Sequence, residues 1–149
     1  MDRQSPTGST PPSQDVLAWM TSASAGTLAE RMQIEYVELT PERLVARMPV
    51  AGNTQPYGLL HGGASVVLAE SLGSIGAILH AGEGRVAVGI EINATHHRAA
   101  REGFVTGTAR PVSVGRTLVC FEVVITDEQD RRLCTSRITC LLRDSPPGS

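Results

Sequence analysis

The chain has 149 residues, a length typical of one domain with a core large enough to fold alone. Hydrophobic residues make up 41% and charged residues 19%, the balance of a globular protein rather than a disordered one. The net charge is −2, and we find neither a run of Lys and Arg nor the spacing of a zinc site. Nucleic acid is therefore not an expected partner, whereas a local basic site for a phosphorylated ligand stays open.

The cysteines and the chain ends indicate the compartment and the domain limits. Cys120, Cys134 and Cys140 are an odd number without a CxxC pair, and each falls in an apolar run. This usage favours a reducing cytoplasm over a disulfide framework. The Ser- and Pro-rich start of the chain lacks the apolar segment of a signal peptide. We expect disordered tails over residues 1–14 and 144–149, around one domain over residues 15–143.

The first predicted elements are a short helix over residues 15–20 and two strands, over residues 34–39 and 43–50. In the second strand apolar residues alternate with Arg43, Val45 and Arg47, the period of a half-buried strand. Residues 53–63 contain one proline and three glycines, which predicts a loop.

That loop leads into residues 64–80, a predicted helix with apolar residues on nearly all sides. A helix without a polar face is buried, and Glu70 and three serines make it a poor membrane span. Strands are predicted over residues 86–93, 104–111, 117–126 and 133–142. The simplest architecture is α+β, with an antiparallel sheet wrapped round the helix. One sheet covers only part of such a helix, so a partner subunit is expected.

Candidate chemistry lies between Gln55 and Ser74. Backbone N–H groups at His61-Gly62-Gly63, where the helix begins, could polarise a carbonyl and hold an oxyanion, and the Gln55 amide could donate a second hydrogen bond. Glu70, in a buried helix, is a candidate nucleophile or general base. Ser74 lies one turn further and could hydrogen-bond that carboxylate or a water. Each residue also has a plain structural explanation, such as a helix start or a solvent-facing side chain.

The distance between two of these groups suggests a site shared by two subunits. Gly62 and Glu70 are eight residues apart, which is about 12 Å along a helix at 1.5 Å per residue. A carbonyl held at the Gly62 N–H is then beyond comfortable reach of Glu70 on the same helix. Two antiparallel helices would bring Gly62 of one chain near Glu70 of the other.

The run QPYGLLHGGA over residues 55–64, with Glu70 nine residues after His61, resembles the hotdog-fold acyl-CoA thioesterase family of the Arthrobacter 4-hydroxybenzoyl-CoA type. Within that family it is most similar to the menaquinone-pathway 1,4-dihydroxy-2-naphthoyl-CoA thioesterase and the enterobactin proofreading thioesterase. The similarity continues through residues 88–94, 96–98, 100–103 and 127–129. It covers roughly residues 34–142.

The resemblance implies a hotdog fold and hydrolysis of an acyl-CoA, with an aromatic acyl group, to free acid and CoA. It implies that Glu70 attacks the thioester or activates water, and that Ser74 supports the attacking group. The Gly62 N–H would polarise the carbonyl, helped by the side chains of Gln55 and His61. The implied contacts to CoA and substrate are Gly89, His96, His97, Arg98, Ala99, Ser113, Val114, Gly115, Arg116, Thr117 and Leu118.

Arg98 and Arg116 could meet phosphates, although both could be ordinary surface arginines. No cofactor beyond the CoA of the substrate is expected, and His96-His97 lacks the partners of a metal site. The expected partners are an acyl-CoA and further copies of the chain, at least a dimer and in full a homotetramer, with no membrane.

Three other functions are compatible with parts of this sequence. A proofreading thioesterase acting on a misloaded acyl or aryl carrier protein differs only in its partner. A non-catalytic acyl-CoA sensor would lack the attacking carboxylate. A hotdog hydratase would need an Asp near His61, and residues 53–60 and the helix contain none.

Overall fold

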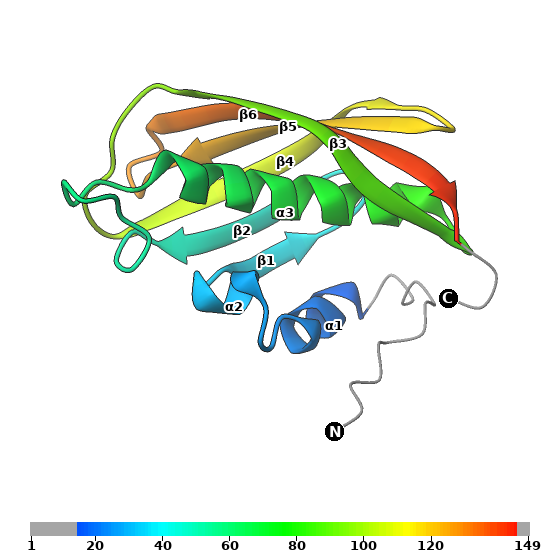
Figure 1. Ribbon diagram of the computed structural model, residues 1–149, viewed down its shortest axis with the longest axis horizontal. Coiled ribbons are helices and arrows are strands. Elements are labelled where there is room, and N and C mark those ends of the chain that lie inside the picture. Colours follow the sequence, from blue (N-terminus) through cyan, green and yellow to red (C-terminus); the bar gives the residue numbers. More distant parts are fainter. Residues whose placement is uncertain (1–14, 146–149) are drawn as a thin grey trace.

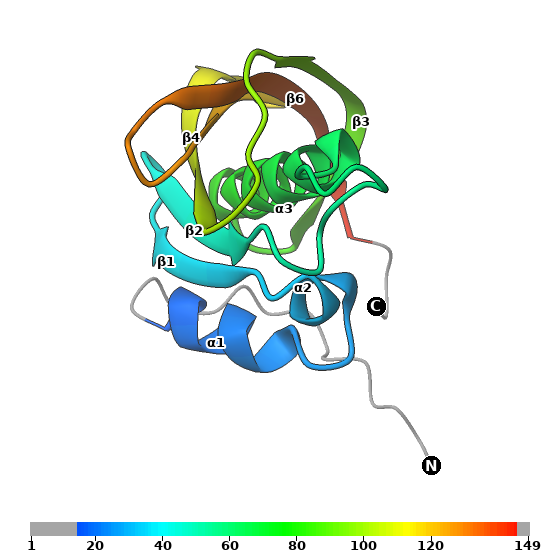
Figure 2. The same ribbon diagram turned by 90° about the vertical axis from the view of Figure 1, so that its left-hand side faces the viewer.

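The computed structural model describes residues 15–145, which form a six-stranded antiparallel sheet wrapped round one long helix (Figures 1 and 2). The predicted architecture is therefore confirmed. In chain order the elements are α1 (Val16–Ala23), α2 (Leu28–Arg31), β1 (Glu35–Leu39), β2 (Leu44–Pro49), α3 (Gly62–Ala81), β3 (Arg85–His96), β4 (Phe104–Val114), β5 (Leu118–Thr126) and β6 (Arg132–Asp144). Strand β6 ends one residue inside the expected C-terminal tail. Residues 1–14 and 146–149 of the expected tails lie outside the described residues.

The order of strands in the sheet is β1-β2-β4-β5-β6-β3. Strand β3 follows α3 in the chain but pairs with β6, so it lies at the opposite edge of the sheet from β1. Seen end-on, the curled sheet surrounds much of α3, with β3 on one side and β1 and β2 on the other (Figure 2). This order brings the strand that follows the helix back alongside the helix.

Helix α3 forms the centre of the core. It is long and apolar enough to cross a membrane, with a mean hydropathy of 1.5, but half of that window is buried inside the protein. Gly73 and Gly76 allow the helix to lie close to the sheet: a Cβ atom would stand 2.2 Å from Ile138 Cγ2 at the first and 2.5 Å from Phe121 Cζ at the second. Glycine in a helix costs about 0.5–1 kcal/mol relative to alanine, and here the close packing offsets that cost.

The sheet leaves one stripe of α3 half-buried, as the sequence predicts for a helix that is apolar nearly all round. Leu68, Leu72 and Ala77 on the sheet side are fully buried. The half-buried stripe consists of Val66, Val67, Glu70, Ser71, Ser74 and Ile78. Half of these residues are apolar, and a half-buried stripe with apolar side chains suits contact with another protein surface.

Strand β3 contains a bulge at Ile90. Gly89 pairs with Cys140, but the next pair is Glu91 with Thr139. One extra residue reverses the alternation of side chains. Both Gly89 before the bulge and His96 after it therefore lie on the face of the sheet that covers α3.

The N-terminal helices lie along β1 (Figure 2). Helix α1 extends to Ala23, three residues beyond its predicted end, and α2 was not predicted. The buried side chain of Asn53 links this region to the loop before α3. Its amide donates to the carbonyl oxygens of Met32 (2.9 Å) and Pro49 (2.8 Å), which fixes the start of that loop.

Candidate active site

Helix α3 begins with His61 as its N-cap. The Nδ1 atom of His61 accepts a hydrogen bond from the Gly63 N–H at 2.8 Å, and the Ala64 N–H donates to the His61 carbonyl at 2.9 Å. Among the described residues, no hydrogen bond involves the Gly62 N–H. This N–H, at the positive end of the helix dipole, can stabilise a negative oxygen.

A pocket of about 420 Å³ opens beside this N-terminus. Its polar lining consists of Gln55, Gly62, Ser65, His96, His97 and Arg98, and its apolar lining of Leu59, Leu60, Ala99, Ala100 and Leu133. The imidazole of His96 stands against the helix start, because a Cβ atom on Gly62 would lie 2.9 Å from His96 Nε2. The side-chain oxygen of Gln55, Oε1, accepts from the Tyr57 N–H, which leaves the side-chain NH₂ group as a donor. The pocket thus offers several donors to one carbonyl oxygen.

Glu70 does not line this pocket. Its carboxylate lies instead at Gly89 on β3, where a Cβ atom would stand 2.5 Å from Glu70 Oε1. Burial raises the pKa of the Glu70 carboxyl above its usual range, as expected for a charged group partly removed from water.

Two further groups lie beside the Glu70 carboxylate. Burial and then the charge of Glu70 raise the pKa of the Cys140 thiol to about 11, while a hydrogen bond with the Ser74 hydroxyl lowers it. Glu70, Ser74, Gly89 and Cys140 therefore form one cluster. The first three are predicted site residues, whereas Cys140 is noted only as a cysteine in an apolar run. Its contact with Glu70 follows from the pairing of β3 with β6, which no local motif reveals.

The predicted contacts from Ser113 to Leu118 form the turn between β4 and β5. The turn is closed by the Gly115 N–H, which donates to the Leu118 carbonyl at 2.8 Å. Beside it lies a cavity of about 520 Å³ lined by Arg85, Arg116, Thr117, Leu142, Arg143 and Asp144. The guanidinium of Arg85 donates to the Arg116 carbonyl at 2.9 Å. This basic cavity is at the start of β3, whereas the pocket of Gly62 and Arg98 is at its end.

The structure therefore divides the predicted site residues into two groups. One group surrounds the pocket and comprises Gln55, His61, Gly62, His96, His97, Arg98 and Ala99. The other lies further along α3 and toward the start of β3 and comprises Glu70, Ser74, Gly89 and Ser113, Val114, Gly115, Arg116, Thr117, Leu118. A single subunit does not bring the carboxylate and the helix start together.

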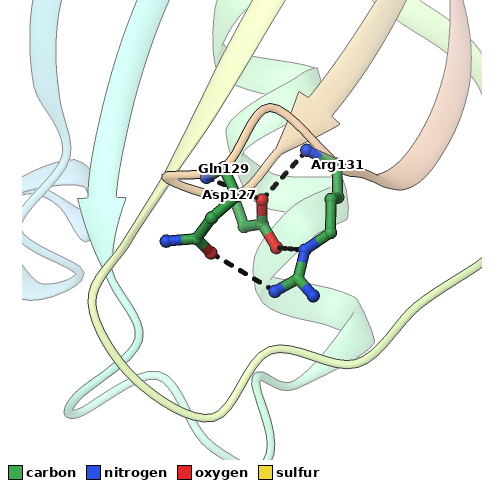
Figure 3. Close-up of polar contacts among 3 residues, drawn as sticks. All are labelled: Asp127, Gln129 and Arg131. Atoms are coloured by element: carbon green, nitrogen blue, oxygen red, sulfur yellow. Dashed lines mark hydrogen bonds and ion pairs between the residues drawn. The ribbon is translucent and has the colours of Figure 1, made fainter.

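The turn between β5 and β6 is held together by contacts among Asp127, Gln129 and Arg131 (Figure 3). The Asp127 carboxylate accepts from the Gln129 N–H (3.0 Å), the Arg131 N–H (2.9 Å) and the Arg131 guanidinium (2.7 Å). Desolvation acts to raise the pKa of Asp127, but these hydrogen bonds together lower it. Arg131 is thus engaged within the turn and is a poor candidate for binding a phosphate. In residues 15–145 no group of three or more His, Cys, Asp or Glu side chains could hold a metal.

Ser65 is a polar residue of the pocket that was not among the predicted site residues. It lies in the first turn of α3 and is 2% exposed, yet it lines the pocket. A serine within an apolar helix carries no distinctive signal by itself. Its position three residues after Gly62, on the same helix face, is the one feature that points to it.

The fold and the helix start define a class of protein. Residues 57–134 match the family model described as thioesterase superfamily. The chain belongs to this superfamily, and it is a thioester hydrolase. It is 50% identical over 121 residues to the proofreading thioesterase EntH of Cronobacter turicensis, covering 80% of this chain and 88% of that one.

Solved structures agree. Thioesterase HI1161 of Haemophilus influenzae is 35% identical with a TM-score of 0.83, covering 87% of this chain and 91% of that one. A mutant of thioesterase PA1618 of Pseudomonas aeruginosa is 34% identical with a TM-score of 0.83, covering 92% and 97%. The expected hotdog fold is confirmed.

Proposed function

We propose that this thioester hydrolase acts on an acyl-CoA with an aromatic acyl group, at sites built from two subunits. The observation that carries the proposal is the position of Glu70. Its carboxylate lies at Gly89, outside the pocket that holds Gly62 and Gln55. Hydrolysis needs an attacking group and a polarised carbonyl at one carbon atom, so a second subunit has to supply one of them.

The surface of the subunit suits such a partner. Strand β3 is an edge strand, and its Val88 and Ile90 are 38% and 56% exposed. Edge strands with apolar side chains readily pair with another chain. Antiparallel pairing of two β3 strands would continue the sheet and set two α3 helices side by side along their half-buried stripes. Glu70 of the partner subunit would then face the Gly62 pocket.

In the proposed reaction the thioester carbonyl oxygen accepts from the Gly62 N–H and the Gln55 amide. Glu70 of the partner subunit either attacks the carbonyl carbon or removes a proton from the attacking water. The tetrahedral oxyanion is held at the helix start and collapses with release of the CoA thiolate, which takes up a proton. When Glu70 is the nucleophile, this collapse leaves an acyl-Glu70 anhydride that water then hydrolyses to the free acid and the carboxylate; when Glu70 is the base, the collapse gives the free acid directly. Ser74 of the partner subunit lies beside that carboxylate and orients it. The residues present require no cofactor beyond the CoA of the substrate.

The same pairing supports a CoA substrate. Antiparallel β3 strands place the end of one strand, with Arg98, opposite the start of the other, with Arg116. One ligand could therefore contact Arg98 of one subunit and the basic cavity of its partner. Guanidinium groups bind phosphate strongly, and the nucleotide end of CoA carries three phosphates.

The experiment that tests the substrate is a thiol-release assay over aromatic and aliphatic acyl-CoAs. We expect the highest kcat/KM with an aromatic acyl group, such as hydroxybenzoyl-CoA or dihydroxynaphthoyl-CoA. Uniformly low turnover on aromatic substrates together with high turnover on aliphatic ones would overturn the aromatic assignment.

A second substrate class is favoured by one observation, the 50% identity to a protein named proofreading thioesterase EntH. Such an enzyme acts on an acyl or aryl group misloaded on a carrier protein. Parallel assays with one acyl group, carried on CoA and on a carrier protein, decide between the two. A much higher kcat/KM on the carrier protein would reassign the physiological substrate.

A further inference from the structure

Ser65 is a polar side chain buried in the wall of the Gly62 pocket. The residue is 2% exposed, and it is one of three buried polar residues among those described, together with Asn53 and Ser136. The amide of Asn53 donates to two carbonyl oxygens, and the hydroxyl of Ser136 donates to the Asn93 carbonyl at 2.8 Å. Each of these two therefore has an internal partner.

The Ser65 hydroxyl is different. Within residues 15–145 it takes part in no hydrogen bond with the protein, and no fully buried side-chain N or O atom there lacks a partner. Its oxygen must therefore reach accessible space, and the space that Ser65 lines is the pocket. Ser71 on the same helix shows the usual alternative, since its hydroxyl donates to the Val67 carbonyl at 2.8 Å. A buried hydroxyl without a hydrogen-bond partner in the protein costs free energy unless a ligand or a water molecule supplies that partner.

The geometry of the helix directs the Ser65 hydroxyl toward the Gly62 N–H, the backbone donor without a partner. Gly62 is the first residue of α3 and Ser65 the fourth, so they share one face of the helix. Side chains in a helix lean toward its N-terminus, which tilts the Ser65 hydroxyl toward Gly62. Both residues line the same pocket, and their two donors converge on one volume.

We propose that the Ser65 hydroxyl donates a hydrogen bond to the carbonyl oxygen of the bound thioester, beside the Gly62 N–H. This inference rests on the proposed function and adds a catalytic residue to it. The hydroxyl keeps its proton throughout and acts as a donor, not as a nucleophile. The bond strengthens as the oxygen gains negative charge, so it stabilises the transition state more than the bound substrate.

The test compares Ser65→Ala with Ser71→Ala, the same chemical change on the same helix at a hydroxyl bonded within the helix. We expect S65A to lower kcat by at least about 10-fold, toward the 10²–10³-fold typical of one oxyanion-hole donor, with little change in KM. S71A should keep nearly wild-type kcat. The Kd of free CoA, which lacks the thioester carbonyl, should be the same in both variants and in the wild type.

Equal kcat values for S65A and S71A would overturn the proposal, and so would a raised KM with unchanged kcat in S65A, because that result places the hydroxyl on another part of the substrate. Circular dichroism and thermal unfolding check the fold. Should S65A fail to fold, Ser65→Cys carries the test, since it nearly keeps the volume and replaces a strong donor with a weak one. A wild-type enzyme without turnover on any acyl thioester would refute the proposed function instead, so the two failures are distinguishable.

Discussion

The carboxylate of Glu70 occupies the space that a side chain at Gly89 would fill. A Cβ atom on Gly89 would stand 2.5 Å from Glu70 Oε1 and 3.5 Å from its carboxyl carbon. A helix residue and an edge-strand residue are thus fitted to each other across the boundary of the core. The absence of a side chain at position 89 is what gives the carboxylate its place beside the sheet.

Gly89→Ala should therefore displace the Glu70 carboxylate and lower kcat by at least about 10-fold, since misplacement by about 1 Å can cost 10²-fold. The free energy of unfolding should change little, because the clash is with the end of a movable side chain. Gly107→Ala is the matched control. Its Cβ would stand 2.9 Å from Leu72 Cδ1 and 3.1 Å from Leu68 Cγ in the core, so it should lower stability. Urea unfolding and steady-state kinetics of both variants test this expectation. A wild-type kcat in G89A would contradict the assignment.

Glu70→Gln should abolish most turnover while the protein stays folded. General-base assistance alone contributes about 10²–10⁴-fold, and a glutamine can neither attack nor accept the proton. Steady-state kinetics on the best acyl-CoA measure the loss. A Glu70→Gln enzyme with wild-type kcat would show that another group attacks the thioester.

Glu70→Gln should lose activity but gain stability at neutral pH. Burial raises the pKa of Glu70 in the folded protein, so the stability linked to its protonation is present below the unfolded pKa and lost as pH rises through the folded value. Glu70→Gln should thus have a higher Tm than the wild type at neutral pH, and the difference should vanish near about pH 4. Thermal unfolding across that range checks the sign, and a lower Tm at neutral pH would contradict it.

Arg98→Ala and Arg116→Ala should each raise KM for an acyl-CoA with little change in kcat, as expected when uniform binding energy far from the reacting carbon is lost. Arg110→Ala is the control, since Arg110 is exposed in β4 opposite Glu122. Isothermal titration with CoA should show weaker binding in the first two variants. A fall in kcat at constant KM would place these arginines at the chemistry instead.

Subunits carrying Glu70→Ala mixed with subunits carrying Gln55→Ala should regain activity. In a shared site, one site of the mixed dimer holds both changes and the other holds neither. Each mixed dimer should then approach half of wild-type activity, whereas each parent stays inactive. Coexpression with two affinity tags isolates the mixed species. Inactive mixed dimers would place Glu70 and Gln55 in the same subunit's site.

Asp127→Asn should destabilise the protein at neutral pH and not at low pH. The hydrogen bonds within its turn lower the pKa of Asp127 in the folded state, so its stability contribution is present above the unfolded pKa and lost as pH falls through the folded value. Urea unfolding at neutral pH and below about pH 3 should show the difference shrinking. An equal loss at both values would mean that the charge of Asp127 is not what matters.

Sequence patterns predicted the long helix and all six strands, because hydrophobic periodicity reports local structure well over such lengths. The helix starts two residues earlier than expected, since His61 caps it and both glycines enter the first turn. Helix α2 escaped prediction because four residues are too few to show a period.

The spatial relations within the site could not be predicted in the same way. The proximity of Glu70 to Cys140 depends on the pairing of β3 with β6. That pairing in turn depends on the path of the chain from the end of α3 to the far edge of the sheet. Ser65 has no local signal of its own in the sequence, because only the pocket distinguishes it from Ser71. The separation of Gly62 from Glu70 was predictable, since helix geometry fixes it.

The bulge at Ile90 is a place where β3 can lose a residue without changing its faces. Deleting Ile90 would let Glu91 follow Gly89 directly and still pair with Thr139, so the residues after it would keep their faces. A deletion after the bulge, at Asn93 for example, would shift the register by one residue, and His96 would leave the helix start. Over an evolutionary history, substitutions at exposed positions here would be tolerated. The count of residues between Glu91 and His96 would be held fixed, because one insertion or deletion there would turn His96 away from the pocket.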